Sequence, residues 1–154
     1  MRNHTLIIRP ALPQDIPDLM RLIRELAAYE HAEDSVRINE EQLLKDGFSS
    51  TPAYQSLIAS LDGKTVGFCL YWYRYSTWRG RLLYVEDLYV CEEFRRRGIG
   101  KSLLAEAMKT AEKEGIEFIS LQVLEWNEPA ISFYRRYWNP NFDGEWLNVL
   151  IPVK

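Results

Sequence analysis

The sequence predicts a single α/β domain in which helices cover both faces of a mixed β-sheet. Strand-like and helix-like segments follow one another in the order β-α-α-β-β-β-α-β-α-β, which combines hairpins with crossover helices. Asp62-Gly63 is a strong two-residue turn signal between two strand-like runs. A chain of 154 residues can bury one full core but not two ordinary ones, so we expect residues 1–154 to form one domain.

The first half of the chain predicts a strand, two helices and three further strands. The strand is TLIIRPA, and the helix after it carries apolar residues at helical spacing from Ile16 to Ala27, with Asp15 as its cap. A second short helix is expected around Glu40 to Lys45 and ends at Gly47. The runs YQSLIASLDGKTVGFCLYWYRYS and RLLYVEDLYV are rich in β-branched and aromatic residues and supply the three strands.

The second half predicts two more helices and two more strands. A long amphipathic helix begins near Ile99 and is closed by Gly115, and the run EFISLQVL then forms a strand. Asn127 and Pro129 open another helix, which carries Tyr134. The run EWLNVLIPV predicts a last strand at the end of the chain.

The composition narrows the classes of protein. No run approaches the roughly 20 apolar residues of a membrane span, and the start MRNHTLIIRPALPQD lacks signal-peptide features, so we expect a cytoplasmic protein without a membrane partner. Two cysteines without CxxC spacing and two histidines make a metal site unlikely, and we expect none. A formal net charge of -3 argues against nucleic acid as the main partner.

The stretch EEFRRRGIGKSLLAEAMKTAEKEG gathers positive charge and bare backbone at the start of the long helix. The first backbone N–H groups of a helix have no partner within it, and together with the helix dipole they form a site for phosphate oxygens. Gly98 and Gly100 let a ligand approach the backbone, and arginine can bind phosphate in bidentate fashion. The spacing fits neither a P-loop nor a dinucleotide fingerprint. The alternative is a solvated basic turn or a nuclear-import-like basic run.

The pattern R-x-x-G-x-G between a strand and a long helix resembles the acyl-CoA pyrophosphate loop of the GCN5-related N-acetyltransferase (GNAT) family. Together with LYVEDLYVCEEFRRRGIG, the runs EWNEPAISFY, LIRELAAYE and LLKDGF resemble the diamine (spermidine/spermine) and thialysine acetyltransferase branch, from Ile8 to about Arg136. The resemblance implies a mixed, mostly antiparallel twisted sheet of six to seven strands flanked by about four helices. It also implies acetyl-CoA as co-substrate and a homodimer.

The resemblance assigns cofactor-binding roles to two parts of the chain. Backbone groups of the strand before the loop would meet the pantetheine arm, and the loop would wrap the pyrophosphate. Asn127 would make a further contact as well as capping its helix. The implied cofactor-binding residues are Leu88, Tyr89, Val90, Arg95, Arg96, Arg97, Gly98, Ile99, Gly100, Lys101, Asn127, Pro129, Ala130 and Arg136.

The resemblance also assigns two catalytic roles. Tyr134 would act as general acid and protonate the departing CoA thiolate; the alternative is an aromatic core residue paired with Phe133. Glu86 and Asp87 interrupt a strand that is apolar on both faces, where an unpaired carboxylate is costly to bury. Glu86 matches the position that would accept the amine proton through a water; the alternative is a structural salt bridge with an arginine such as Arg81.

The resemblance also implies a set of acceptor-binding residues. Trp78 could form an apolar or cation-π wall for an alkylammonium chain, and the acidic residues near Glu30 have the alternative of a solvated helix end. After Tyr134 the family continues to a glycine where this chain has Trp138, so the chain departs from the family pattern at the last strand and at any dimer contact through it. Asp143 and Glu145 are the acidic residues of this region that could touch the substrate. The set is Tyr29, Glu30, Trp78, Glu86, Asp87, Ser120, Leu121 and Gln122.

The function that follows is an acetyl-CoA-dependent N-acetyltransferase acting on a primary amine of a small cationic acceptor, a polyamine or a thialysine-like or lysine-like amino acid. Direct attack in a ternary complex is expected, because neither Cys69 nor Cys91 lies near a histidine in the sequence or within a recognised catalytic signature. Three alternatives remain: a protein or peptide N-acetyltransferase, a CoA-binding module without turnover, and a basic-loop nucleic-acid binder.

Overall fold

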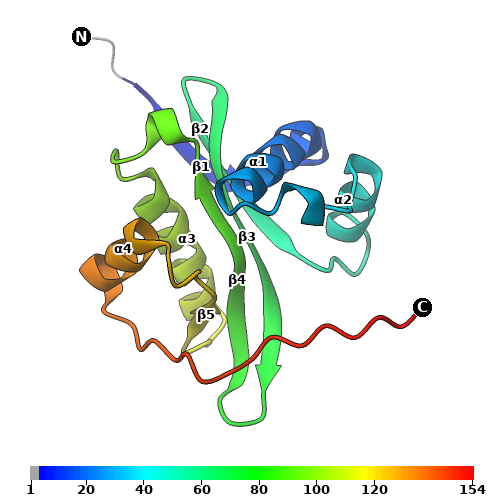
Figure 1. The fold of residues 1–154 in the computed structure, drawn as a ribbon. Helices are drawn as coiled ribbons and strands as arrows, with labels where there is room; N and C mark the ends of the chain where they lie inside the picture. Colours follow the sequence, from blue (N-terminus) through cyan, green and yellow to red (C-terminus); the bar gives the residue numbers. More distant parts are fainter. Residues whose placement is uncertain (1–3) are drawn as a thin grey trace. The chain divides into compact units, whose positions relative to one another are not determined.

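The computed structural model describes residues 4–154 and divides into two compact units, one ending at Gln122 and the other covering Val123–Lys154 (Figure 1). Residues 1–3 lie outside the described residues. They belong to the N-terminal stretch in which the sequence shows no signal-peptide features. That residues 1–154 form one domain stays a prediction.

The first unit is built on a five-stranded sheet in the order β1-β2-β3-β4-β5. Neighbours from β1 to β4 are antiparallel, and β5 pairs with β4 in parallel. The mixed, mostly antiparallel sheet is therefore confirmed, but the described chain has five strands and not six to seven. The strands are β1 Leu6–Pro10, β2 Gln55–Leu61, β3 Lys64–Ser76, β4 Gly80–Val90 and β5 Ile119–Leu121.

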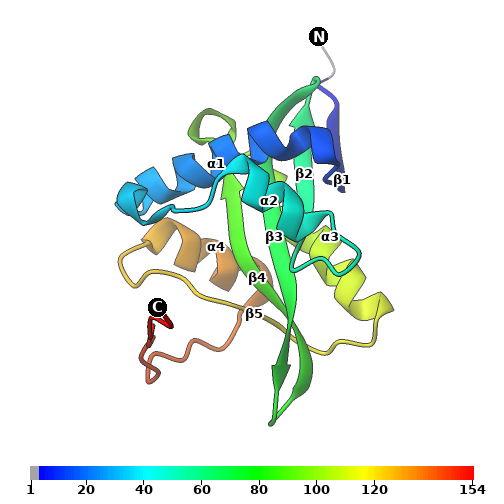
Figure 2. The ribbon, with the colours of Figure 1, turned by 90° about the vertical axis from the view of Figure 1, so that its right-hand side faces the viewer.

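Three helices of this unit cover the two faces of the sheet. Helices α1 (Ile16–Tyr29) and α2 (Glu40–Gly47) lie on one face, and α3 (Ile99–Lys113) lies on the other (Figures 1 and 2). No helix among residues 4–154 has both the length and the apolar character that a bilayer crossing requires.

The start of α1 differs from the prediction. Asp15 ends a short 3-10 turn (Pro13–Asp15), and its side chain does not cap α1. Its carboxylate instead accepts two hydrogen bonds from the Arg9 guanidinium, at 2.6 and 2.8 Å, and one from the Leu12 backbone N–H at 2.7 Å. This partly buried ion pair joins β1 to the start of α1, and hydrogen bonding to Arg9 lowers the pKa of Asp15 below its ordinary value.

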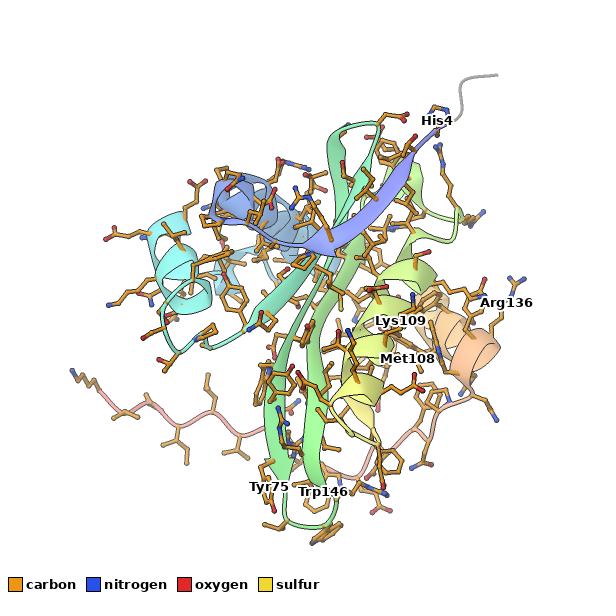
Figure 3. All side chains as sticks on the ribbon, turned by 180° about the vertical axis from the view of Figure 1, so that it is seen from behind. His4, Tyr75, Met108, Lys109, Arg136 and Trp146 are labelled. Atoms are coloured by element: carbon orange, nitrogen blue, oxygen red, sulfur yellow. The ribbon has the colours of Figure 1, made fainter. Side chains whose placement is uncertain are left out.

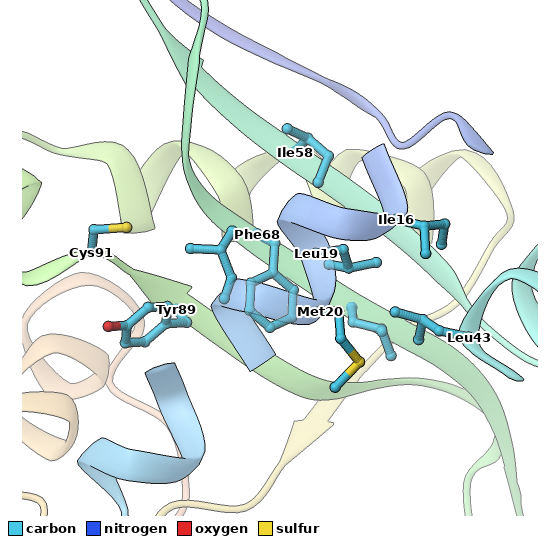
Figure 4. Close-up of a cluster of buried hydrophobic side chains, with 10 residues drawn as sticks. Ile16, Leu19, Met20, Leu43, Ile58, Phe68, Tyr89 and Cys91 are labelled. Atoms are coloured by element: carbon cyan, nitrogen blue, oxygen red, sulfur yellow. The ribbon is translucent and has the colours of Figure 1, made fainter. Parts of the chain in front are cut away.

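The core between α1, α2 and the sheet consists of large apolar side chains from α1, α2, β2, β3 and β4 and the residue just after β4 (Figure 4). Each fully buried side chain of this size stabilises the fold by about 1.5–3 kcal/mol. The cluster also includes Tyr89, near the carboxyl end of β4, and Cys91, which follows the strand. This end of β4 is therefore fixed against α1. The buried members are Ile16, Leu19, Met20, Leu22, Leu43, Ile58, Phe68, Leu70, Tyr89 and Cys91.

On the opposite face, α3 packs closely because of one glycine. A Cβ at Gly67 would lie 2.8 Å from the Tyr89 carbonyl oxygen and 3.4 Å from Leu103 Cδ1. Leu103 and Ala107 on the facing side of α3 are fully buried. The bare backbone of β3 at Gly67 thus lets α3 and β4 approach each other at the point where the chain passes from strand to helix.

The second unit contains α4 (Glu128–Trp138) and a long irregular end. The prediction that Asn127 caps this helix is confirmed, because its Oδ1 accepts a hydrogen bond from the Ala130 N–H at 3.3 Å. The predicted last strand is wrong: residues 139–154 form no helix or strand, and Leu147 and Leu150 are 90% and 98% exposed. The run has high β-propensity, but a strand also needs a neighbour for its backbone hydrogen bonds, and none pairs with it among residues 4–154.

Candidate active site

The predicted phosphate loop joins β4 to α3 through left-handed backbone. After β4 the chain makes a 3-10 turn (Glu92–Phe94), and Arg96 and Gly98 then have φ of +62° and +77°. Gly98 is the N-cap of α3, and its carbonyl oxygen accepts from the Ser102 N–H at 3.0 Å. The N–H groups of the first turn, beginning at Ile99, therefore point out of the helix as the sequence predicts. Space around Gly98 is open, since a Cβ built there meets no atom within 4 Å.

The three arginines of this loop behave differently from one another. Arg95 Nε donates to the Val90 carbonyl oxygen at 2.8 Å, and its guanidinium lies 4.9 Å from the Tyr29 ring centroid and 5.4 Å from that of Tyr89. Arg95 thus ties the end of α1 to the end of β4, with its charge spread over two aromatic faces. Arg97 donates to the Glu93 carbonyl oxygen at 3.3 Å. Arg96 is exposed and has no hydrogen bond or ion pair with any described residue.

Only the first part of β4 pairs with β5 along the edge that the two strands share. Leu83, Tyr84 and Val85 pair with β5, whereas the residues from Asp87 to Val90 pair only with β3 among the described strands. The second edge of this segment therefore has backbone N–H and C=O groups without a strand partner. Leu88, Tyr89 and Val90 lie in it, so their backbone is suited to hydrogen-bond an extended, amide-containing chain.

A β-bulge in β4 lies where pairing with β5 ends. Val85 pairs with Tyr71 and Asp87 pairs with Leu70, so Glu86 is an extra residue between two consecutive partners. In a regular strand, consecutive side chains point to opposite faces, and a bulge breaks this alternation.

The bulge brings Glu86 and Asp87 to the same face of the sheet. Asp87 is paired with Leu70, which belongs to the cluster under α1. Glu86 Oε2 accepts a hydrogen bond from Trp72 Nε1 at 2.9 Å, and Trp72 lies two residues from Leu70 on the same face of β3. The ring of Tyr84 lies 5.1 Å from that of Trp72 and completes an aromatic pair beside the two carboxylates.

The carboxyl of Asp87 has an unusual environment. Burial, followed by the negative charges of Glu86 and Glu30, raises its pKa to about 7. No hydrogen bond to this carboxyl comes from any residue between 4 and 154. Burial also raises the pKa of Glu30, at the end of α1. Strongly raised carboxyl pKa values of this kind are typical of functional sites.

Glu86 neither forms the salt bridge with Arg81 that was its alternative role nor lies beside Trp78. The proposed salt bridge with Arg81 does not form, because Arg81 pairs with Glu114 at 3.5 Å. Trp78 lies in the turn between β3 and β4, near Tyr75, which is labelled in Figure 3, and is 85% exposed. Glu86 is six residue steps along β4 from Gly80, about 20 Å at 3.3 Å per residue, so Trp78 is not beside the carboxylates.

The aromatic residues beside Glu86 are ones that the sequence reasoning missed. Trp72 and Tyr84 are opposite one another in the β3–β4 register, and their contact follows from that pairing. The signal was present in part, because Tyr84 and Glu86 are two residues apart on one strand. The other predicted strand residues, Ser120 and Leu121, pair with Tyr84 and Val85 from β5, and Gln122 follows them.

Residues of the second unit keep their predicted positions on α4. The ring centroid of Tyr134 lies 5.2 Å from that of Phe133, and the carbonyl oxygen of Tyr134 accepts from the Asn139 N–H at 3.2 Å. The Arg136 guanidinium, labelled in Figure 3, lies 5.4 Å from the Tyr137 ring centroid. Asp143 is occupied locally, since its carboxylate accepts from Trp146 Nε1 and the Glu145 N–H.

Neither cysteine resembles an activated nucleophile. Cys69 is fully buried, and burial raises the pKa of its thiol to about 12. Burial and the charge of Glu25 raise the pKa of Cys91 as well. A thiolate is the reactive form of cysteine, so these environments do not favour an acyl-enzyme.

A surface hollow of about 630 Å³ lies apart from the residues assigned above and shares only Tyr89 with them. Its charged walls are paired internally, Arg21 with Glu25 at 2.8 Å and Lys64 with Glu93 at 3.2 Å. Among residues 4–154, no group of three or more histidine, cysteine, aspartate or glutamate side chains is arranged to hold a metal ion.

The chain belongs to the acetyltransferase (GNAT) family, whose family model matches residues 16–138. This match confirms the family resemblance seen in the sequence. Thialysine N-epsilon-acetyltransferase of Bos taurus is 42% identical over 137 residues, which are 84% of this chain and 81% of that protein. Spermidine/spermine N(1)-acetyltransferase-like protein 1 of Homo sapiens is 37% identical over 134 residues, which are 82% of this chain and 19% of that protein.

Solved structures share the fold at lower sequence identity. An aminoglycoside acetyltransferase from an uncultured soil metagenomic sample, in complex with trehalose, matches with a TM-score of 0.78 and 24% identity over 97% of both chains. An aminoglycoside N-acetyltransferase in complex with CoA matches with a TM-score of 0.74 and 20% identity, over 99% of this chain and 97% of that one.

The environment of Asp87 predicts a pH-dependent cost to stability. Its pKa is higher in the folded than in the unfolded chain, so the folded protein loses relative stability as the pH rises from about 4 to about 7. Asp87→Asn should therefore increase the free energy of unfolding at pH 8 by about 1–3 kcal/mol and raise the thermal midpoint there. At pH 4 the variant should unfold at nearly the same temperature as the wild type. Thermal unfolding at several pH values measures this.

Asp15→Asn is the control for that experiment because its pKa shift has the opposite sign. Asp15 has a lowered pKa, so its contribution to stability is present above about pH 4 and is lost as the pH falls. This variant should be destabilised at pH 8. If Asp87→Asn is also destabilised at pH 8, the environment described for Asp87 is wrong.

Proposed function

We propose that this protein transfers the acetyl group of acetyl-CoA to a primary amine of a small cationic acceptor, a thialysine-like or lysine-like amino acid or a polyamine. The observation that carries the proposal is the organisation of β4. One end of the strand leads into a helix start whose first N–H groups suit an anion, and its bulge bears two carboxylates beside two aromatic rings. The relatives named thialysine N-epsilon-acetyltransferase support the class of acceptor.

The cofactor-binding part of the proposal assigns the diphosphate to the start of α3. The open backbone at Gly98 and the outward N–H groups of the first helical turn suit phosphate oxygens. Arg96 supplies the exposed positive charge, whereas Arg95 acts mainly as a brace between α1 and β4. The unpaired edge of β4 at Leu88, Tyr89 and Val90 would receive the amides of the pantetheine arm.

The acceptor-binding part of the proposal assigns the ammonium groups to the carboxylates at the bulge. Glu86, Asp87 and Glu30 provide negative charge, and the rings of Trp72 and Tyr84 provide a cation-π surface. Acetyl-CoA, when bound, supplies the thioester carbonyl that the amine attacks. Holding the two reactants together would provide most of the acceleration.

Tyr134 is proposed as the general acid that protonates the departing sulfur. This role comes from the family position, and a phenol hydroxyl can donate a proton to a departing thiolate. The homodimer, the cytoplasmic location and the contacts of Asn127, Pro129, Ala130, Lys101 and Arg136 with the cofactor stay predictions.

A panel of amines tests the reaction itself. Purified protein with acetyl-CoA and thialysine, lysine, spermidine, spermine or putrescine should release free CoA, measured with a thiol reagent, and give a monoacetylated product by mass spectrometry. Peptides with a free N-terminal amine should react at least tenfold more slowly, because they lack a compact cationic chain for the carboxylates. CoA binding without any release would leave a binding module, and faster reaction of peptides would favour a protein N-acetyltransferase.

Gly98→Val tests the diphosphate site. Valine is strained at a φ of +77°, at a cost of about 1–3 kcal/mol, so the loop should change shape and CoA should bind roughly tenfold more weakly by calorimetry. Gly115→Val is a matched control, since Gly115 has a φ of +69° and open space at the other end of α3. The control should keep its CoA affinity. Equal CoA affinity in the Gly98 variant would remove this loop from the cofactor site.

Tyr134→Phe tests the general acid. Loss of the hydroxyl should lower kcat by roughly ten- to hundredfold and leave CoA affinity unchanged, because a thiolate is already a fair leaving group. Tyr137→Phe, on the same helix, is the control and should keep its turnover. An unchanged kcat in the Tyr134 variant would exclude the tyrosine from the chemistry.

A further inference from the structure

We propose that Asp87, and not Glu86, accepts the proton that the acceptor's ammonium group must lose, and that Trp72 is a positioning residue that holds Glu86 beside it. This assignment rests on the proposed acetyl transfer to amines. It differs from the role that the family resemblance gives to Glu86, and it follows from the β-bulge, which sets the two carboxylates on one face of the sheet in different environments.

The hydrogen bonds of the two carboxylates point to different roles. Glu86 is exposed and accepts a hydrogen bond from Trp72 Nε1 at 2.9 Å, so one of its carboxylate oxygens already has a donor. Asp87 is half-buried, and no donor among residues 4–154 satisfies its carboxyl. A carboxylate without a donor gains most from receiving a proton.

The charges around Asp87 act in the same direction. Glu86 on its own strand and Glu30 at the end of α1 both disfavour its ionised form. Burial raises the pKa of the other neighbouring groups, Tyr84 on β4 and Cys69 on β3, so these groups stay uncharged at neutral pH. No cation appears among the groups that act on this carboxyl.

The resulting base strength suits the acceptor. An alkylammonium has a pKa of about 10.4, and a carboxylate of ordinary pKa is more than a millionfold too weak to take its proton at equilibrium. With its pKa raised to about 7, Asp87 is roughly a thousandfold stronger as a base, yet about half of it remains ionised at neutral pH. Glu86, held by Trp72, would contact the cation during the transfer.

The proposed step balances as follows. The ammonium N–H bond breaks and its proton passes to an Asp87 carboxylate oxygen, which leaves a lone pair on the nitrogen. That lone pair forms the C–N bond to the thioester carbon, and the C–S bond breaks with its electron pair going to sulfur. The second nitrogen proton is lost as the amide forms, the sulfur is protonated to give free CoA, and Asp87 returns its proton to solvent.

The experiment compares the pH dependence of kcat/KM in Asp87→Asn and Glu86→Gln, with thialysine and spermidine as acceptors. The wild type should lose activity below about pH 7. Asp87→Asn should lose about a hundredfold or more at pH 7.5, lack this acidic limb, and gain activity with pH as free amine accumulates. Glu86→Gln should retain the limb, shifted to lower pH, with a raised KM and at least a tenth of the wild-type kcat.

Two further measurements separate base catalysis from simple binding. An acceptor amine whose pKa is lowered to near 7 by an electronegative substituent arrives largely unprotonated, so the kcat defect of Asp87→Asn should shrink at least tenfold with it. Trp72→Phe should shift the acidic limb in the same direction as Glu86→Gln, because Glu86 is no longer held beside Asp87. CoA affinity should be unchanged in all three variants, which verifies that they are folded.

The proposal is overturned if Glu86→Gln removes the acidic limb or if Asp87→Asn keeps it. It is also overturned if Asp87→Asn raises KM alone, since the residue would then only bind the cation. Failure of the wild type to release CoA with any amine would instead contradict the proposed acetyl transfer. The two failures are therefore distinguishable in one set of assays.

Discussion

The bulge at Glu86 is the constraint on which the candidate site depends. It ends the pairing of β4 with β5 at Val85, and it turns two neighbouring carboxylates toward the same face. In a regular strand, one of the two carboxylates would point toward α3. Burying it among the apolar side chains there would destabilise the fold, and it would be separated from the other carboxylate. The same extra residue therefore opens the strand edge for one ligand and assembles the charges for another.

The two kinds of charge are kept apart along β4. The carboxylates lie at the bulge, and the basic loop follows the carboxyl end of the strand, with Leu88 to Val90 between them. Arg95 lies between the two groups of charges. Its guanidinium contacts the rings of Tyr29 and Tyr89 and donates to the Val90 carbonyl oxygen. It forms no ion pair with an acidic residue among residues 4–154. A negative ligand and a positive ligand can thus bind at one strand with limited mutual neutralisation of their sites.

The elements of the fold were predictable from the sequence where local signals decide them. The apolar spacing of α1 and α3, the turn at Asp62-Gly63 and the cap at Asn127 all appear in the structure. The last strand was not predictable in the same way, because β-propensity in the terminal run says nothing about whether a neighbour is available to pair with it. The capping role of Asp15 failed for a related reason, since the distant Arg9 competes for its carboxylate.

The candidate site was predictable only in part, because its geometry depends on register. The motifs identified the loop and the two carboxylates, but the contact of Glu86 with Trp72 requires knowledge of which residues of β3 and β4 face each other. A bulge leaves no local signature in the run LLYVEDLYV, so Trp78 was a reasonable but remote candidate for the aromatic wall. Register is a property of two strands and cannot be read from either one alone.

The position of Asp87 shows how such a site is maintained against its own cost. A carboxyl whose pKa is raised to about 7 weakens the folded state at neutral pH, and a bulge by itself is a break in the hydrogen-bond ladder. Both are held because the surrounding structure fixes them: Leu70 and Tyr89 anchor the strand in the core, Gly67 brings α3 against it, and Arg95 locks its end to α1. Local strain and misplaced charge persist only where neighbouring packing over-determines the backbone, and such places are commonly functional. The rigidity of β4 on both sides of the bulge is therefore what allows one residue within it to remain a base.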